Sequence, residues 1–196
     1  MNQINLDLES IAEIFNEHFP RGVIEHIDRS DITGFTLEKF EDEAKRFKSI
    51  YGPDPNYFVL TMRINYDSGN YTYAALHEFP EDRCSDYILF LRDFNCDKEE
   101  TGCGRFELDT TRRKYSKKPS VGFIYTEELF LHRGFGTRRL RVMNALSNAI
   151  FDLKLHSSSN QSPDAEKIWK KLVENNEATI CHEPDDLIRS YIYRFR

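Results

Sequence analysis

The chain has 196 residues, 39% of them hydrophobic and 13% aromatic, which suits one folded domain with a sizeable core. No apolar run approaches the roughly 20 residues that a membrane-spanning helix needs, so we expect no contact with a membrane. The net charge of −6 comes entirely from residues 1–60, which hold 6 Lys/Arg against 12 Asp/Glu. An acidic N-terminal third argues against a general nucleic-acid binder.

The beginning of the sequence and the cysteines indicate the compartment. The first ten residues lack the basic and apolar regions of a secretion signal, which predicts a cytoplasmic protein whose four cysteines are reduced. Six residues separate Cys96 from Cys103, unlike the C-x2-C pairing of structural zinc sites, so no metal is expected.

Residues 1–55 form the helical N-terminal part of the predicted single domain, 1–196. Apolar residues recur at helical spacing over 5–19 and again over 36–50. Pro and Gly follow each run, at Pro20-Arg21-Gly22 and Gly52-Pro53-Asp54-Pro55, and end both predicted helices.

Residues 56–132 change to a pattern typical of strands. Three runs rich in β-branched and aromatic residues, 57–65, 71–79 and 86–95, follow one another through short connections and predict an antiparallel meander. Residues 96–118 are polar with two glycines, which indicates a long loop with a short strand at 105–108. A fourth strand is predicted over 120–131.

Residues 133–196 complete the chain with alternating elements. The patterns predict a helix over 137–150, a fifth strand over 151–156, and a helix from Pro163 to about residue 174. Two further strands are predicted, over 178–182 and 187–195. The order is α-α-β-β-β-β-α-β-α-β-β, which indicates an α+β domain with a central sheet flanked by helices.

The segment Arg133-Gly134-Phe135-Gly136-Thr137 joins the fourth predicted strand to the following helix. A strand that turns through glycines into a helix presents free backbone N–H groups and the positive end of the helix dipole, which favours a phosphate. Three arginines follow at Arg138, Arg139 and Arg141. The alternative is a tight turn followed by a solvated basic helix face.

This motif and the element order resemble the GCN5-related N-acetyltransferase (GNAT) superfamily. A second block agrees, because Ser162 stands where that superfamily usually has Asn, Ala165 follows three residues later, and Trp169 stands where it usually has Tyr. Motif-level similarity covers 121–172, and the element order covers 57–195. The resemblance implies a mixed, mostly antiparallel sheet whose fourth and fifth strands splay apart.

The resemblance also implies that acetyl-coenzyme A (acetyl-CoA) binds where those strands part. Its thioester end would pair with the main chain of the fourth strand, its pyrophosphate would lie on the N–H groups of the glycine turn, and an arginine (Arg133, Arg138 or Arg139) would reach a phosphate. The residues expected at the cofactor, including those of the second block, are Leu129, Leu131, Arg133, Gly134, Phe135, Gly136, Thr137, Arg138, Ser162 and Trp169.

The implied reaction is direct attack of an amine on the thioester, with the amine carried by a small molecule or a protein. Glu127 and Glu128, expected on opposite sides of the fourth strand, and His132 at its end are the candidate general bases; surface ion pairs are the alternative for the two carboxylates. Trp169 cannot donate a proton as the usual Tyr does, so another tyrosine (Tyr125, Tyr191 or Tyr193) or solvent would serve, and ordinary core packing is its alternative role.

Two other functions stay open. One is a GNAT-fold protein without catalysis that binds a protein partner through its acidic helical N-terminus. If the protein is instead an enzyme and this N-terminus lies beside the acceptor cleft, its charge favours a cationic acceptor. A nucleic-acid binder, the less favoured alternative, would use the basic clusters 112–118 and 133–141. The last predicted strand resembles an exposed edge that could pair with a second copy in a homodimer.

Overall fold

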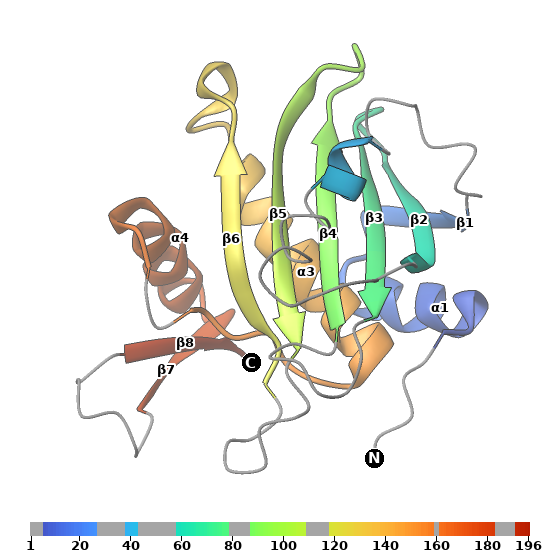
Figure 1. The fold of residues 1–196 in the computed structure, drawn as a ribbon. Helices are drawn as coiled ribbons and strands as arrows, with labels where there is room; N and C mark the ends of the chain where they lie inside the picture. The colour runs from blue at the N-terminus through green and yellow to red at the C-terminus, as the bar shows by residue number, and fades with distance from the viewer. Residues whose placement is uncertain are drawn as a thin grey trace.

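The computed structural model is α+β and is built on a six-stranded antiparallel sheet (Figure 1). It describes residues 6–26, 38–42, 58–78, 87–108, 118–158, 161–182 and 191–196. The sheet runs in chain order through β1 (Gly22–His26), β2 (Phe58–Tyr66), β3 (Tyr71–Glu78), β4 (Tyr87–Phe94), β5 (Glu100–Leu108) and β6 (Ser120–Thr126). The predicted antiparallel meander and the α+β class, with a central sheet flanked by helices, are therefore confirmed, whereas the finer GNAT-like arrangement stays a prediction.

Two helices cover one face of this sheet. Helix α1 (Leu8–His18) begins at Asp7, whose carboxylate accepts a hydrogen bond of 3.0 Å from the N–H of Ser10, and it packs against α3 (Phe135–Phe151). Residues 38–42 are helical and lie on the opposite face (Figure 1). The remainder of the helix predicted over 36–50 lies outside the described residues.

The C-terminal part forms a smaller unit beside β6. Helix α4 (Pro163–Glu174) stands next to a two-stranded antiparallel sheet of β7 (Ala178–His182) and β8 (Tyr191–Phe195) (Figure 1). The helix begins as predicted, with Pro163 in its first turn and the hydroxyl of Ser162 accepting from the N–H of Ala165 at 3.2 Å.

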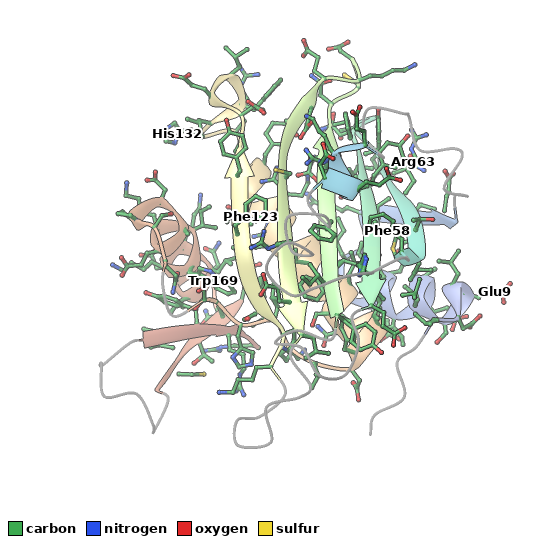
Figure 2. All side chains as sticks on the ribbon, viewed as in Figure 1. Glu9, Phe58, Arg63, Phe123, His132 and Trp169 are labelled. Atoms are coloured by element: carbon green, nitrogen blue, oxygen red, sulfur yellow. The ribbon has the colours of Figure 1, made fainter. Side chains whose placement is uncertain are left out.

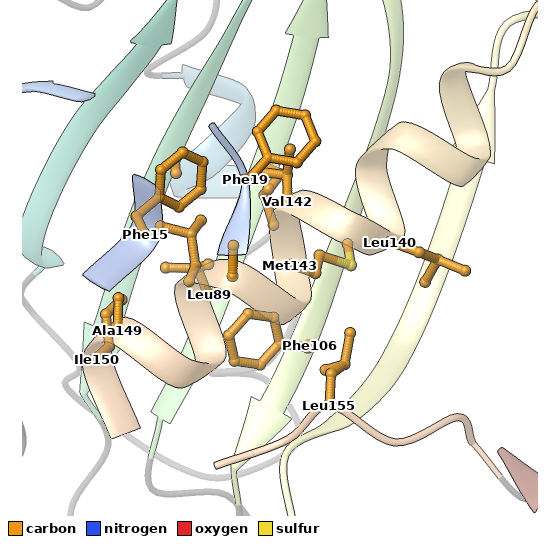
Figure 3. Packing of buried hydrophobic residues seen from close by; sticks show 14 of the residues in the cluster. Phe15, Phe19, Leu89, Phe106, Leu140, Val142, Met143, Ala149, Ile150 and Leu155 are labelled. Atoms are coloured by element: carbon orange, nitrogen blue, oxygen red, sulfur yellow. The ribbon is translucent and has the colours of Figure 1, made fainter. Parts of the chain in front are cut away.

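Helix α3 is the centre of the main core. Twelve of its 17 residues are buried, and Leu140, Val142 and Met143 belong to one cluster with Phe15 of α1 and Phe106 of β5 (Figure 3). A second apolar cluster lies against β3 and β4 and includes Phe40 of the 38–42 turn. Because both faces of β3 and β4 are covered, these strands are buried almost throughout instead of alternating between buried and exposed residues.

Strand β5 is longer than the sequence predicts, and β1 was not predicted. Strand β5 is nine residues long, whereas the sequence predicts a loop over 96–118 with a short strand at 105–108. Gly102 and Gly104 favour the loop prediction, but at Gly102 the packing requires a glycine. A Cβ at Gly102 would lie 2.2 Å from the carbonyl oxygen of Tyr125 and 2.5 Å from Nη2 of Arg139.

Strand β6 ends at Thr126, five residues before the predicted end at Leu131. The N–H of Glu127 donates to the carbonyl of Thr101 near the start of β5, so the chain beyond it has no strand to pair with. Residues Glu128–Phe130 instead form a single 3-10 turn, η2, which leads into α3. The prediction that Glu127 and Glu128 lie on opposite sides of a strand is therefore wrong.

The predicted fifth strand, 151–156, is reduced to two bridges at His156. Phe151 is the last residue of α3, and side chains of α3 hold the segment that follows: Ser147 donates to the carbonyl of Leu153 at 2.7 Å, and Asn144 accepts from the N–H of Leu155 at 3.1 Å. His156 bridges Ser120 in parallel and Arg194 in antiparallel orientation. Among the described residues, no further bridge joins this segment to β6.

Candidate anion site at the start of helix α3

The glycine turn before α3 leaves the first turn of the helix uncapped. Gly134 is the N-cap residue with φ 85°, a left-handed conformation that glycine adopts at little cost, and no side chain accepts from the helix start. Among the described residues, the N–H groups of Phe135, Gly136 and Thr137 have no hydrogen-bond partner. No acidic residue occupies the first turn, so the positive end of the helix dipole is not neutralised there.

The space in front of Gly134 is open. A Cβ built at Gly134 would meet no heavy atom within 4 Å. Arg133 precedes it, with its guanidinium carbon 5.6 Å from the ring centre of Phe130 in η2 and with its side chain exposed. The predicted residues Arg133, Gly134, Phe135, Gly136 and Thr137 therefore lie together on one turn that an anion can approach.

Arg138 does not contribute its N–H group, which corrects the prediction. That N–H donates to the carbonyl of Gly134 at 3.0 Å and closes the first helical turn. The guanidinium lies over the rings of Tyr66 and Phe135, with its carbon 4.7 and 4.8 Å from their centres. The long side chain thus turns towards the β2–β3 hairpin and leaves the front of Gly134 free.

Gly136 has a packing role that the sequence could not show. A Cβ at this position would lie 3.0 Å from Cδ1 of Ile168 on α4 and 3.7 Å from Oγ1 of Thr126 at the end of β6. The start of α3 is therefore enclosed on one side by α4 and by the last residue of β6.

Leu129 and Leu131 do not pair as a strand, because both lie at the turn that follows β6. Their N–H and carbonyl groups belong to a segment closed by local bonds, such as the one from Leu131 N–H to the carbonyl of Glu128 at 3.3 Å. The Leu129 residue is 80% exposed and Leu131 is 47% exposed. These two leucines form an apolar surface next to the glycine turn.

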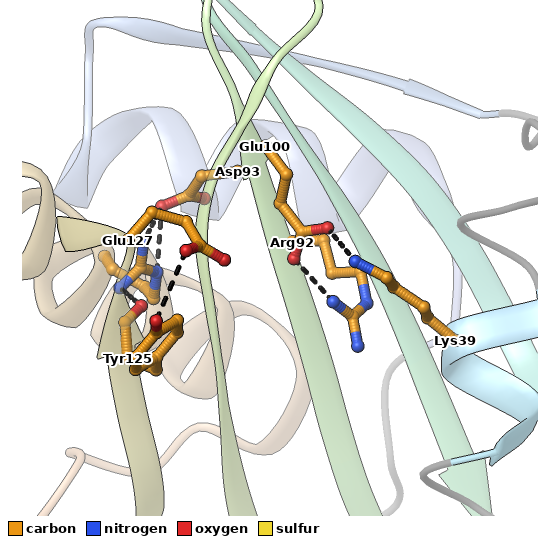
Figure 4. Close-up of polar contacts among 7 residues, drawn as sticks. Lys39, Arg92, Asp93, Glu100, Tyr125 and Glu127 are labelled. Carbon is orange, nitrogen blue, oxygen red and sulfur yellow. Dashed lines mark hydrogen bonds and ion pairs between the residues drawn. The ribbon is translucent and has the colours of Figure 1, made fainter. Parts of the chain in front are cut away.

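Acid–base groups gather at the same end of β6. The hydroxyl of Tyr125 donates to Glu127 at 3.2 Å (Figure 4). The negative charge of Glu127, together with this hydrogen bond, raises the pKa of the Tyr125 phenol, so the phenol keeps its proton at neutral pH. Glu128 and His132 are both exposed, and His132 lies beyond the end of the strand, with φ 62° (Figure 2).

Arg139 is buried in a polar network that sequence reasoning missed. Its Nε and Nη2 each lie 2.8 Å from Oδ2 of Asp93 on β4, and its Nη1 donates to the carbonyl of Tyr125 at 2.6 Å (Figure 4). Oδ1 of Asp93 accepts from Thr72 at 2.6 Å, and Thr72 contacts the hydroxyl of Tyr66 at 2.7 Å. Burial, the largest effect, raises the pKa of Tyr66. Because its guanidinium is bonded to Asp93 inside the protein, Arg139 is not available to a phosphate, which corrects one of the three arginine predictions.

The second sequence block stabilises α4 instead of joining the turn. Trp169 is 1% exposed and stacks on Tyr193, with ring centres 5.9 Å apart, and its edge contacts Phe195 at 5.2 Å (Figure 2). Ser162 uses its hydroxyl to cap α4. Core packing, the alternative stated for Trp169, is what the structure shows, and the expected contact of Trp169 with a cofactor is not supported.

Other site chemistries find little support in the described part of the chain. No group of three or more His, Cys, Asp or Glu side chains there could hold a metal ion, and Cys96, Cys103 and Cys181 form no disulfide within it. Within the same residues, no helix combines the length and the apolar character needed to cross a bilayer.

Comparison with known proteins gives no family assignment. The chain matches no model of a known protein family, and a search of curated proteins finds no significant match.

Proposed function

We propose that the protein is an N-acyltransferase that moves an acetyl group from acetyl-CoA to an amine. The observation that carries the proposal is the uncapped first turn of α3, which follows β6 through an open glycine and offers three unpaired N–H groups. The resemblance to the GNAT superfamily supplies the ligand that this geometry suits.

The turn is suited to the pyrophosphate of the coenzyme. The N–H groups of Phe135, Gly136 and Thr137 would donate to its oxygens, and the helix dipole would favour its charge. Arg133, exposed beside the turn, would pair with a second phosphate oxygen. The exposed leucines 129 and 131 offer an apolar surface for the pantetheine arm.

The proposed chemistry takes place at the end of β6. The amine nitrogen attacks the thioester carbonyl carbon, a C–N bond forms, and the C–S bond breaks. Glu127, Glu128 or His132 would take the amine proton, directly or through water. The protonated phenol of Tyr125 is placed near the same strand end and would protonate the leaving thiolate.

Calorimetric titration with acetyl-CoA tests the proposal, and Phe135 offers a matched pair of variants. Phe135→Pro removes one N–H group at the first helical position, where proline is tolerated, whereas Phe135→Ala keeps the N–H and loses only the ring. We expect the wild type and Phe135→Ala to bind, and Phe135→Pro to bind about tenfold more weakly because one charge-assisted hydrogen bond is lost. Absence of wild-type binding at millimolar acetyl-CoA would remove the proposal.

A catalytically inactive protein that binds a protein partner is the second candidate. The burial of Trp169 favours it, since the residue in the position of the usual Tyr lies in the core, and the exposure of Leu129 fits a contact surface. Acetyl-CoA binding without acetyl transfer to any amine would support this candidate. The nucleic-acid alternative is weakened because Arg139 and Arg141, two of its basic residues, are paired with carboxylates.

A further inference from the structure

A pocket of about 600 Å³ opens on the side of α3 that faces α1. Its walls come from the end of α1 and the residues after it, from the β2–β3 turn, and from α3. Arg138 of this pocket is two residues beyond Gly136, which faces α4. Two residues correspond to about 200° around a helix, so the pocket lies on a different side of α3 from the contact with α4.

The lining of the pocket carries excess positive charge. It includes Arg21, Arg138 and Arg141, with Asp67 as the single carboxylate. Arg141 is already neutralised by Glu177, through two hydrogen bonds of 2.6 Å. No ion pair joins Arg21 or Arg138 to a carboxylate in the described part of the chain.

Arg138 is the most informative of these cations. Solvent does not reach its Nε and Nη2, and neither atom has a hydrogen-bond partner among the described residues. Its guanidinium is held over the rings of Tyr66 and Phe135 at 4.7 and 4.8 Å. Stacking of this kind fixes the direction of the side chain but leaves the positive charge without a counter-ion.

The rest of the wall is partly apolar, and His18 and Ser68 add polar groups to it. Phe19 and Tyr66 are 9% and 8% exposed and contribute ring surface, and Pro20 lies between the α1 end and Arg21. The hydroxyl of Tyr66 is engaged with Thr72 inside the molecule. The pocket thus combines unpaired guanidinium groups with partly apolar walls, and its volume lies within the range of small-molecule sites.

We propose that this arginine pocket, formed by Arg21, Tyr66, Arg138 and Arg141, binds a small organic oxyanion. The anionic group pairs with the guanidinium of Arg21 and with Nη1 of Arg138, the nitrogen of that guanidinium that is not enclosed, and the apolar body of the ligand lies against Phe19 and Pro20. Carboxylates and phosphate monoesters share this chemistry. The pocket is separate from the N–H groups at the start of α3, so its occupancy does not depend on acetyl-CoA binding.

The test uses two probes that share a phenyl body, benzoate and phenyl phosphate, titrated into the purified full chain and followed by protein NMR. We expect at least one probe to bind at millimolar concentration or below. Arg138→Met keeps most of the apolar stem and removes the charge, so we expect affinity to fall about tenfold or more. Arg21→Met, which leaves α3 unchanged, should also weaken binding. Arg194→Met removes an exposed charge on β8 and should leave affinity unchanged.

The variant Thr137→Glu distinguishes binding in this pocket from binding at the start of α3. Its carboxylate would repel a phosphate at the uncapped turn, yet binding in the arginine pocket should persist within about twofold. The proposal is overturned if neither probe binds at 10 mM, or if both Arg138→Met and Arg21→Met bind as the wild type does while retaining its thermal unfolding. Loss of binding in Thr137→Glu alone would also overturn it, because the probe would then occupy the helix start.

Discussion

Two neighbouring regions of α3 differ in whether their polar groups have hydrogen-bond partners. At the start of the helix, three N–H groups have no partner among the described residues and the space before Gly134 is open. One turn further, Arg139 is enclosed and bonded to Asp93, Tyr125 and Thr126. The difference separates the two roles: paired groups determine how α3 sits on the sheet, and unpaired groups remain available to a ligand.

The largest expected effect comes from breaking the buried pair. Arg139→Met leaves the Asp93 carboxylate buried with only the hydrogen bond from Thr72, so unfolding free energy should fall by about 3–5 kcal/mol. Denaturant unfolding measures this, and Arg133→Met, at an exposed arginine, should change stability by less than about 0.5 kcal/mol. A loss below 1 kcal/mol for Arg139→Met would show that the network does not hold α3 in place.

Gly102, which packs against Arg139, and Gly134, at the start of α3, allow a second comparison of the two regions. Gly102→Ala places a Cβ 2.2 Å from the backbone oxygen of Tyr125, which cannot easily move, and we expect a loss of about 3 kcal/mol. In Gly134→Ala the new Cβ meets no heavy atom within 4 Å, and the loss of about 1–2 kcal/mol in unfolding free energy comes only from the left-handed backbone conformation.

Asparagine provides the control for that pair. Gly134→Asn should cost less than Gly134→Ala, because Asn tolerates positive φ better than Ala does. Thermal unfolding of the three variants checks the order. Equal losses at Gly102 and Gly134 on mutation to Ala would contradict the view that one region is filled and the other open.

A carboxylate introduced into the uncapped turn should have opposite effects on stability and binding. Thr137→Glu places a negative charge at the positive end of α3 and should stabilise the fold by about 0.3–1 kcal/mol. The same charge should abolish acetyl-CoA binding, whereas Thr137→Gln should retain it. If Thr137→Glu binds acetyl-CoA as tightly as Thr137→Gln does, the diphosphate does not lie on this turn.

A similarly small effect on stability is expected for the ion pair between Arg141 of α3 and Glu177. Hydrogen bonds from Arg141 hold the pKa of Glu177 below the usual pKa of a glutamate. The ion pair therefore stabilises the fold fully at pH values above the usual glutamate pKa. This stabilisation is lost as the pH falls through the lowered pKa of Glu177. Because both side chains are about a third exposed, Glu177→Gln should cost only about 0.5–1 kcal/mol at pH 7.

Denaturant unfolding at several pH values checks this prediction. The difference between wild type and Glu177→Gln should shrink as the pH falls below the usual range of a glutamate, and Glu13→Gln, on the exposed side of α1, serves as the control. A difference that grows as the pH falls has the wrong sign for this account.

Local signals in the sequence predicted α1, α3, α4 and the glycine turn well. Apolar spacing located α3, and Ser162 followed by Pro163 marked the start of α4. The end of β6 was missed because Leu129, Phe130 and Leu131 look like a strand, while the pairing partner had already ended near Thr101.

Long-range contacts account for the other errors. The glycines of β5 indicated a loop because their partner, Arg139, is distant in sequence. Arg138 and Arg139 look alike in sequence, yet they are about 100° apart on the helix. One therefore stacks on Tyr66 and the other bonds to Asp93, 46 positions away. Which side of a helix meets a buried carboxylate depends on packing that residue spacing does not show.

The most direct test of the central claim is the response of individual backbone amides to coenzyme A. NMR signals of the Phe135, Gly136 and Thr137 N–H groups should shift together and saturate with the ligand. The Arg138 N–H, already bonded to the carbonyl of Gly134, should respond less. If saturating coenzyme A leaves the signals of 135–137 in place, these groups do not hold the diphosphate and the acyltransferase proposal fails.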